Sequence, residues 1–335
     1  MSDLDLLGWD AGWAAAFTAL PEADLLAARV VFEHGRFYEV STGAATISAV
    51  SAGSLRHAAA TSAALPTTGD FVALRPAQAS SGKLATIRHV LPRRSRFSRR
   101  AAGKNDVEQV VAANVDTVFL MMGHDGDFNL RRIERYLAMA FASGARPIVV
   151  LNKADLASDL VARVASVNAS AAAMPVLSTD LTLPDGARPL WPFIEPRKTI
   201  ALLGSSGVGK STLLNLLAGS DVARTGATDA RTGRGRHTTT RAQLFALPGG
   251  ALVIDTPGLR ELQLWDADEG VDAAFPDVAV HASACRFSDC RHRDEPDCAV
   301  RAAVAAGVLT ADRYDSWHKL HTELAAARPR RGPRR

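Results

Sequence analysis

The sequence predicts a multi-domain α/β protein: a small β-barrel, then a doubly wound domain with a parallel sheet, then a helical module that carries the cysteines. Three observations support this fold class. Short β-segments fill residues 29–92, apolar runs alternate with helical stretches over residues 116–255, and all three cysteines lie within 14 residues. With 335 residues, 47% hydrophobic and 22% charged, the chain can bury the cores of two or three domains.

The N-terminal part reads as five short strands separated by glycine, serine, threonine and proline, which is typical of a small barrel. Such barrels often bind oligonucleotides. Phe37 and Tyr38 form an aromatic pair, but adjacent strand residues point to opposite faces. The strands alone therefore leave nucleic-acid binding and any other small β-domain open. The predicted strands begin at Arg29, Arg36, Ala45, Asp70 and Ala85.

Five continuous apolar runs predict strands that are buried on both faces of a parallel sheet. Helical stretches separate them, notably 130–143, where Ile133, Leu137 and Phe141 recur at four-residue spacing, and 211–217. This alternation indicates a doubly wound domain. The predicted strands cover residues 117–122, 147–151, 174–178, 199–203 and 251–255.

A phosphate-binding loop follows the fourth of these runs and precedes a helix, with the pattern G-x-x-x-x-G-K-[ST]. Its glycines let backbone N–H groups wrap around phosphates, Lys210 would reach the β- and γ-phosphates, and the Ser211 hydroxyl would bind Mg²⁺. The predicted phosphate-binding residues are Gly204, Ser205, Ser206, Gly207, Val208, Gly209, Lys210, Ser211 and Thr212.

Two further motifs end apolar strands of the same domain. In Asp255-Thr-Pro-Gly258, Asp255 can hold Mg²⁺ through water and the Gly258 N–H can meet the γ-phosphate. Each motif alone is also common in an ordinary turn, but beside a phosphate-binding loop they predict a guanine nucleotide site. The base-binding residues would be Asn152, which braces its loop, Lys153, whose stem covers the base, Ala154, and Asp155, whose carboxylate accepts both N–H groups of the guanine edge.

The motif order is permuted, because residues 152–155 precede the phosphate-binding loop at 204–211. Loops at the carboxyl ends of parallel strands converge wherever the chain is cut, so the geometry permits this order. Residues 233–240 occupy the first switch segment, where Thr239 would complete the Mg²⁺ shell and His237 could act in hydrolysis. Leu259 stands where Ras-like GTPases orient water with glutamine, which predicts slow intrinsic turnover, the missing group coming from His237, a backbone group or a partner.

The cysteines surround a histidine with the spacing of a metal site: Cys285, Cys290, His292 and Cys298. Three thiolates and one imidazole form a closed tetrahedral shell, which is typical of structural Zn²⁺. The alternatives are buried cysteines or a redox pair. Because no other thiols exist, a disulfide framework is excluded and a reducing compartment fits.

The net charge of +4 is unevenly spread. Residues 83–104 hold eight basic and no acidic side chains, and residues 328–335 hold five arginines; without these thirteen, 26 basic residues face 35 acidic ones. This distribution indicates a polyanion-binding protein, although a solvated loop and a disordered tail would explain it equally. We predict that one set of arginines contacts RNA phosphates: Arg93, Arg94, Arg96, Arg99 and Arg100.

No apolar run reaches the roughly 18 residues that a membrane span needs. The first 20 residues contain three aspartates and neither lysine nor arginine, so they do not read as a secretory signal. We therefore expect a soluble cytoplasmic protein without a membrane partner.

Together these features resemble the ribosome small subunit-dependent GTPases, the RsgA family of bacterial circularly permuted GTPases, over about 300 residues. Phe71 replaces the tryptophan usual there, and Ser178-Thr-Asp180 departs from the Ser-Ala-Lys-like base-edge loop. The matching residues are Leu91–Ser95, Ala101–Lys104, Gln109–Asp116, Asn152–Asp155, Gly204–Thr212, Gly235–Thr240, Asp255–Leu259 and the Cys/His cluster.

The resemblance implies an OB-fold barrel, a circularly permuted P-loop GTPase domain and a zinc-binding domain. It implies GTP hydrolysis to GDP and phosphate, stimulated by the 30S subunit, contact with 16S rRNA, and late subunit maturation by a monomer holding one Zn²⁺ and using Mg²⁺ with GTP. A nucleic-acid-binding module with a merely structural nucleotide, and an ATP-dependent enzyme, are the alternatives. The expected segments are 1–28 (extension), 29–95 (barrel), 96–265 (GTPase), 266–327 (zinc) and 328–335 (basic tail).

Overall fold

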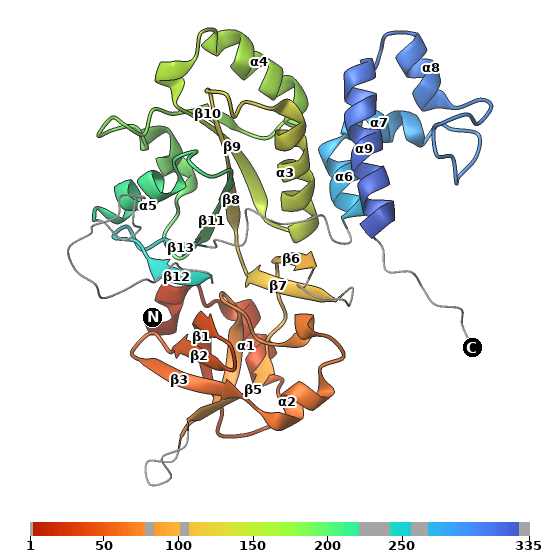
Figure 1. Cartoon of the computed structure of the whole chain (residues 1–335). Coiled ribbons are helices and arrows are strands. Elements are labelled where there is room, and N and C mark those ends of the chain that lie inside the picture. The colour runs from red at the N-terminus through yellow and green to blue at the C-terminus, as the bar shows by residue number, and fades with distance from the viewer. Residues whose placement is uncertain (1–2, 78–83, 101–106, 221–241, 256–266, 328–335) are drawn as a thin grey trace.

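A computed structural model describes residues 3–77, 84–100, 107–220, 242–255 and 267–327. In this part of the chain, a barrel, a central sheet flanked by helices and a helical module adjoin one another (Figure 1). The barrel and the central sheet share one 11-stranded sheet. No helix among these residues is long and apolar enough to cross a bilayer.

The N-terminal barrel has the predicted OB-type arrangement. Its strands follow the order β1-β2-β3-β5-β4, and β4 pairs back onto β1, so the barrel closes. The β3–β5 pair is parallel and the other pairs are antiparallel. The elements are β1 (Leu26–His34), β2 (Phe37–Ser41), β3 (Thr46–Ser51), α2 (Gly53–Ala58), η2 (Ser62–Ala64), β4 (Phe71–Arg75) and β5 (Ala85–Val90).

The N-terminal segment packs on the barrel, as η1 (Asp3–Leu7) and α1 (Ala11–Thr18). No helix was predicted from the sequence over these residues. Buried Trp13 lies 4.4 Å from the Phe71 ring, centroid to centroid, and donates its indole N–H to Pro92 O at 3.2 Å. Asp10 caps α1 and pairs with Arg94 at 2.6 Å, while the Arg94 guanidinium stacks on Trp13.

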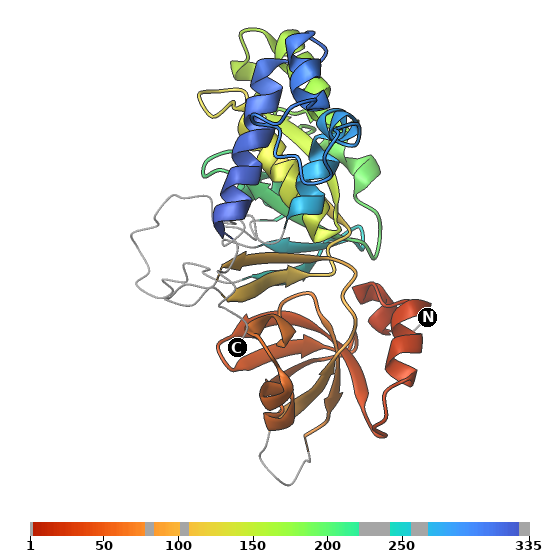
Figure 2. The same cartoon turned by 90° about the vertical axis from the view of Figure 1, so that its right-hand side faces the viewer.

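A two-stranded antiparallel sheet, β6 (Arg96–Arg100) and β7 (Glu108–Ala113), lies between the barrel and the central sheet (Figure 2). No strand was predicted from the sequence over residues 93–108, where basic side chains dominate. Phe97, 2% exposed, packs in the core of the central domain, while Arg96 beside it is exposed and Arg99 and Arg100 are half-buried. The arginines concealed the alternation that marks a strand.

The central domain is doubly wound. Five parallel strands run in the order β10-β9-β8-β11-β13, and antiparallel β12 follows. Helices α3 and α4 pack on one face, and α5 and η4 on the other. The elements are β8 (Thr117–Gly123), α3 (Leu130–Ser143), β9 (Arg146–Asn152), α4 (Leu160–Ser170), β10 (Val176–Ser178), η4 (Arg188–Phe193), β11 (Thr199–Gly204), α5 (Lys210–Ala218), β12 (Gln243–Ala246) and β13 (Leu252–Asp255).

The barrel and the central sheet are joined through β12, which pairs antiparallel with β1 at Phe32 and Gln243. The Thr68 hydroxyl of the barrel also donates to Ala242 O at 3.0 Å. The central sheet therefore continues into the barrel by backbone pairing.

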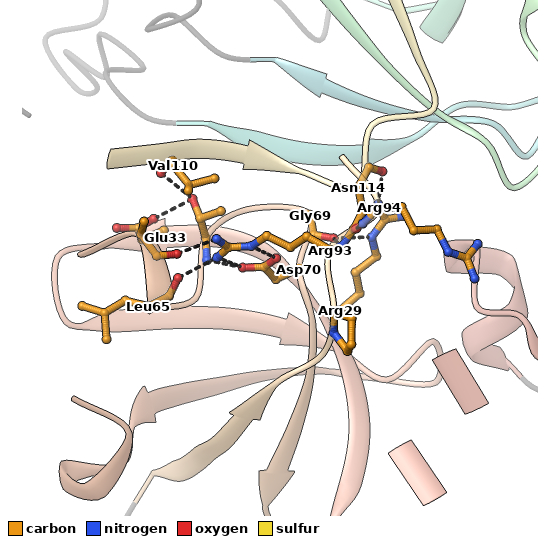
Figure 3. A network of polar contacts seen from close by, with 12 residues as sticks. Arg29, Glu33, Leu65, Gly69, Asp70, Arg93, Arg94, Val110 and Asn114 are labelled. Carbon is orange, nitrogen blue, oxygen red and sulfur yellow. Dashed lines mark hydrogen bonds and ion pairs between the residues drawn. The ribbon is translucent and has the colours of Figure 1, made fainter. Parts of the chain in front are cut away.

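The buried guanidinium of Arg29 lies at the junction between the barrel and the central domain (Figure 3). Arg29 is 1% exposed and donates to Leu7 O at 2.6 Å and to Gly69 O and Asn114 O at 3.1 Å. Burial lowers the pKa of Arg29 to about 10, so it stays charged at neutral pH. Gly69 has φ of 95°, and a Cβ there would lie 2.0 Å from Ala113 O, so no larger residue fits.

Beside it, Asp70 and Arg93 form a buried, two-pronged ion pair (Figure 3). Asp70 is fully buried and accepts from Arg93 Nε at 2.8 Å and from Arg93 Nη2 at 2.7 Å. The remaining Arg93 donors meet Ala63 O and Leu65 O, and Thr67 N donates to the carboxylate.

The expectation that Arg93 contacts RNA phosphates was therefore wrong, whereas the one for Arg94, whose side chain is 48% exposed, stays a prediction. Arg93 is committed to Asp70, and Arg94 pairs with Asp10 on α1. Arg96 remains open: its side chain is 56% exposed and lies 3.6 Å from Glu108.

The C-terminal module packs against α3 of the central domain (Figure 1). Buried Glu134 of α3 accepts from Arg313 Nη1 at 2.6 Å, and Arg313 also pairs with Asp277 at 2.9 Å over the Phe275 ring. The apolar residues of the module and of α3 belong to one core. The helices are α6 (Asp268–Ala274), α7 (Pro276–Ala282), α8 (Ala299–Ala305) and α9 (Ala311–Ala327).

We predict that Arg93→Ala lowers the free energy of unfolding by about 3–5 kcal/mol, because it leaves the Asp70 carboxylate buried without its partner. Guanidinium titrations followed by circular dichroism measure the change. Arg96→Ala is the control and should stay within about 0.5 kcal/mol of the wild type. Equal stability of the two variants would contradict this role for the ion pair.

Candidate nucleotide and metal sites

The phosphate-binding loop connects β11 to α5 in a tight curl. Gly209, with φ of 109°, ends the loop, and a Cβ there would lie 2.4 Å from Asn152 Nδ2. Lys210 begins α5 and donates its Nζ to Gly204 O at 2.7 Å and to Ser205 O. The curl lies at the N-terminus of α5, where backbone N–H groups and the helix dipole favour phosphate.

Asn152 connects three segments of the site. It ends β9, donates Nδ2 to Val208 O at 2.8 Å, and accepts at Oδ1 from Thr179 Oγ1 and Leu181 N, both at 3.2 Å. The structure thus brings the base-binding motif, the phosphate-binding loop and the segment after β10 together. Asn152 is 4% exposed, so this bracing amide is shielded from water.

The remaining base-binding residues follow Asn152. Lys153 has a left-handed backbone with φ of 62° and precedes η3 (Ala154–Leu156). Ala154 N donates to Thr179 O at 3.1 Å. The Asp155 side chain is exposed, which leaves its carboxylate accessible to a ligand.

Asp255 ends β13, which pairs in parallel with β11, so it lies at the same edge of the sheet as the phosphate-binding loop. Ser211 and Thr212 lie in the first turn of α5. The other predicted catalytic residues, His237, Thr239 and Gly258, lie outside the described residues, as does Leu259.

Two carboxylates that the motif analysis missed also reach this edge. Asp127 accepts from Ser205 Oγ at 2.5 Å and pairs with Arg132. Asp125 lies 2.5 Å from Lys153 Nζ. A signal existed in the sequence, because both residues lie in the loop that follows β8, and loops at the carboxyl ends of parallel strands line such sites.

The four predicted metal ligands come together in the C-terminal module. The ligand atoms of Cys285, Cys290, His292 and Cys298 all lie within 4.8 Å of one another. His292 Nδ1 is 3.4 Å from the sulfurs of Cys285 and Cys298, and these sulfurs are 3.9 Å apart. Burial lowers the pKa of His292, which favours the neutral imidazole that a metal needs.

These separations fit a tetrahedral metal centre. With Zn–S near 2.3 Å and Zn–N near 2.0 Å, tetrahedral angles place two sulfurs about 3.8 Å apart and a sulfur and a nitrogen about 3.5 Å apart. The four residues can therefore hold one metal ion in a closed shell. A closed shell has no open position for a substrate and is the structural kind of site.

Neighbouring groups hold the ligand loop in shape. Tyr314 of α9 donates its hydroxyl to His292 O at 2.7 Å. The Glu295 carboxylate accepts from Arg291 N at 3.0 Å and from Arg293 N at 2.8 Å, and hydrogen bonds from backbone N–H groups lower its pKa to about 2. The loop is thus tied both to itself and to α9.

A P-loop beside an N-K-x-D loop and a strand-ending aspartate, in this chain order, defines a circularly permuted P-loop GTPase. Residues 90–265 match the family model described as RsgA GTPase, and the chain belongs to this family.

Relatives match over nearly the whole chain. The small ribosomal subunit biogenesis GTPase RsgA of Opitutus terrae is 51% identical over 98% of this chain and 92% of its own length. Its namesake from Syntrophotalea carbinolica is 43% identical over 96% and 89%. Among solved structures, YjeQ from Thermotoga maritima is 27% identical, with a TM-score of 0.66 over 91% of this chain and all of its own. YloQ, a circularly permuted GTPase, shares the fold at 24% identity, with a TM-score of 0.62 over 92% of this chain and 98% of its own.

We predict that Cys298→Ala abolishes stable metal binding, because three ligands leave the shell open. Metal content by mass spectrometry should fall from about one ion per chain, and the thermal unfolding temperature should fall with it. His281→Ala, which removes a nearby imidazole outside the ligand set, is the control and should keep its metal. Full metal content in Cys298→Ala would exclude this ligand assignment.

Proposed function

We propose that this protein binds the small ribosomal subunit, assists its late maturation, and hydrolyses GTP to GDP and phosphate at a rate that the subunit stimulates. One observation carries the proposal: Asn152 joins the guanine motif to the phosphate-binding loop, in a chain 51% identical over 98% of its length to a small ribosomal subunit biogenesis GTPase.

In this proposal, residues 204–212 hold the phosphates, with Lys210 on the β- and γ-phosphates. Ser211 and Asp255 hold Mg²⁺, the latter through water, and residues 152–155 bind guanine. Thr239 completes the Mg²⁺ shell, and the Gly258 N–H donates to the γ-phosphate. His237 acts in hydrolysis.

Hydrolysis needs water in line with the bond between the γ-phosphorus and the β–γ bridging oxygen. The water oxygen bonds to the γ-phosphorus as that bond breaks, both water protons leave on the phosphate as H2PO4−, and GDP keeps the bridging oxygen. Leu259 cannot hydrogen-bond water, so intrinsic turnover is slow. A group that the bound subunit positions or supplies, His237 among the candidates, orders the water.

Further parts of the proposal concern partners and boundaries. The Cys/His cluster holds one structural Zn²⁺, because thiolate-rich closed shells select zinc. Exposed arginines on the barrel side and around the metal loop contact 16S rRNA phosphates. The protein acts as a cytoplasmic monomer, with the segments 1–28, 29–95, 96–265, 266–327 and 328–335 as its working units.

The test is the GTP hydrolysis rate with and without purified small subunits. We expect the subunit to raise the rate severalfold or more, and Lys210→Ala to remove activity under both conditions. Equal rates with and without subunits would overturn the proposal. If Lys210→Ala still rescued subunit assembly in cells, the nucleotide would be a structural ligand only.

A second prediction concerns the base. Asp155→Asn should weaken GTP binding by about 10²-fold, because two charge-assisted hydrogen bonds are lost. It should improve binding of xanthosine triphosphate, whose 2-carbonyl accepts from an amide. Asp159→Asn is the control, since Asp159 caps α4 and asparagine caps equally well. Unchanged preference in Asp155→Asn would favour an ATP-type site.

A further inference from the structure

A lysine–aspartate pair links the guanine motif to a loop outside all the nucleotide-binding motifs. Asp125 lies between β8 and α3, and its Oδ2 is 2.5 Å from Lys153 Nζ. The two side chains are 29% and 28% exposed, so water screens the pair only in part. We propose that Asp125 is a positioning residue of the guanine site, holding Lys153 ready to cover the base; this rests on the function proposed above.

The loop that carries Asp125 is itself fixed in place. His124 N donates to Asn152 O at 2.8 Å, and Asp127 N donates to Asp125 Oδ1 at 3.0 Å. The Asp127 carboxylate in turn binds Ser205 of the phosphate-binding loop. Asp125 is therefore attached to the base-binding loop directly and to the phosphate-binding loop through Asp127.

The benefit of this arrangement is entropic. Lysine has four rotatable side-chain bonds, and ordering such a side chain on binding costs about 1–2 kcal/mol. The ion pair orders Lys153 when the protein folds, and it lowers the pKa of Asp125 through the hydrogen bond from Lys153. The stem then meets the base without a further ordering cost.

This role predicts a distinct pattern of effects. Lys153 covers the base and makes no contribution that depends on the number of phosphates. Loss of Asp125 should therefore weaken GDP and GTP binding equally. It should leave kcat at saturating GTP unchanged.

The experiment is the dissociation constant of GDP and GTP for Asp125→Asn, which keeps an acceptor for Asp127 N and removes the charge. We expect both constants to rise about threefold to tenfold, with kcat within about twofold of the wild type. Asp125→Ser, which also retains a local acceptor, should show the same loss and serves if Asp125→Asn does not fold.

The matched control is Asp116→Asn. Asp116 pairs with Lys198 at 3.1 Å. The two residues directly precede β8 and β11, so they lie at the end of the strands that is opposite to the nucleotide-binding loops. The side chains of Asp116 and Lys198 are 38% and 51% exposed, so water reaches this ion pair as it does that of Asp125 and Lys153. This variant should bind GDP as the wild type does.

A double-mutant cycle decides the route. In a Lys153→Met background, which keeps the stem and removes the ammonium, Asp125→Asn should cause no further loss. An equal loss in both backgrounds, or no loss in the wild-type background, would overturn the proposal. A wild-type protein that bound no guanine nucleotide would instead defeat the proposed function, so the two failures are distinguishable.

Discussion

The buried ion pair of Asp70 and Arg93 fixes the barrel loop, residues 67–69, that meets the rest of the molecule. A carboxylate with no exposed surface is stable as an ion only when hydrogen-bond donors surround it, and Arg93 supplies two of them. Arg93 also fastens the segment before the barrel's fourth strand. Gly69 lets the barrel backbone approach Ala113 O closely, and Arg29 donates across the junction to Asn114 O. The barrel loop that hydrogen-bonds to β7 and to Ala242 is thus held in shape by one buried ion pair.

A second buried pair, Glu134 with Arg313, joins helix α3 of the central domain to the C-terminal module. Helix α3, which carries Glu134, begins directly after the loop of Asp125 and Asp127. One helix thus touches the metal-binding module along its side and the nucleotide-binding edge at its start. Helix α3 therefore connects the nucleotide-binding edge to the metal-binding module directly.

Much of this architecture could be predicted from sequence, because apolar runs and glycine-rich motifs act locally. Helix 130–143 has the same bounds in the structure, and all five expected barrel strands form. Arg93 was misassigned because charge is readable in a sequence while its partner, 23 residues away, is not. Asp125 was missed because its partner Lys153 follows the neighbouring strand β9, and the sequence does not show that β8 and β9 are paired. The α1 segment, rich in alanine, carries little periodicity to recognise.

The pairing of β12 with β1 protects a vulnerable part of the sheet. Without the barrel, β12 would be an outer strand with a row of unsatisfied N–H and C=O groups, open to a strand from another molecule. In the intact chain, pairing with β1 occupies this edge of β12 at Gln243. A central domain without its barrel would keep every nucleotide-binding motif, but it would expose the edge of β12 that pairs with β1 in the intact chain.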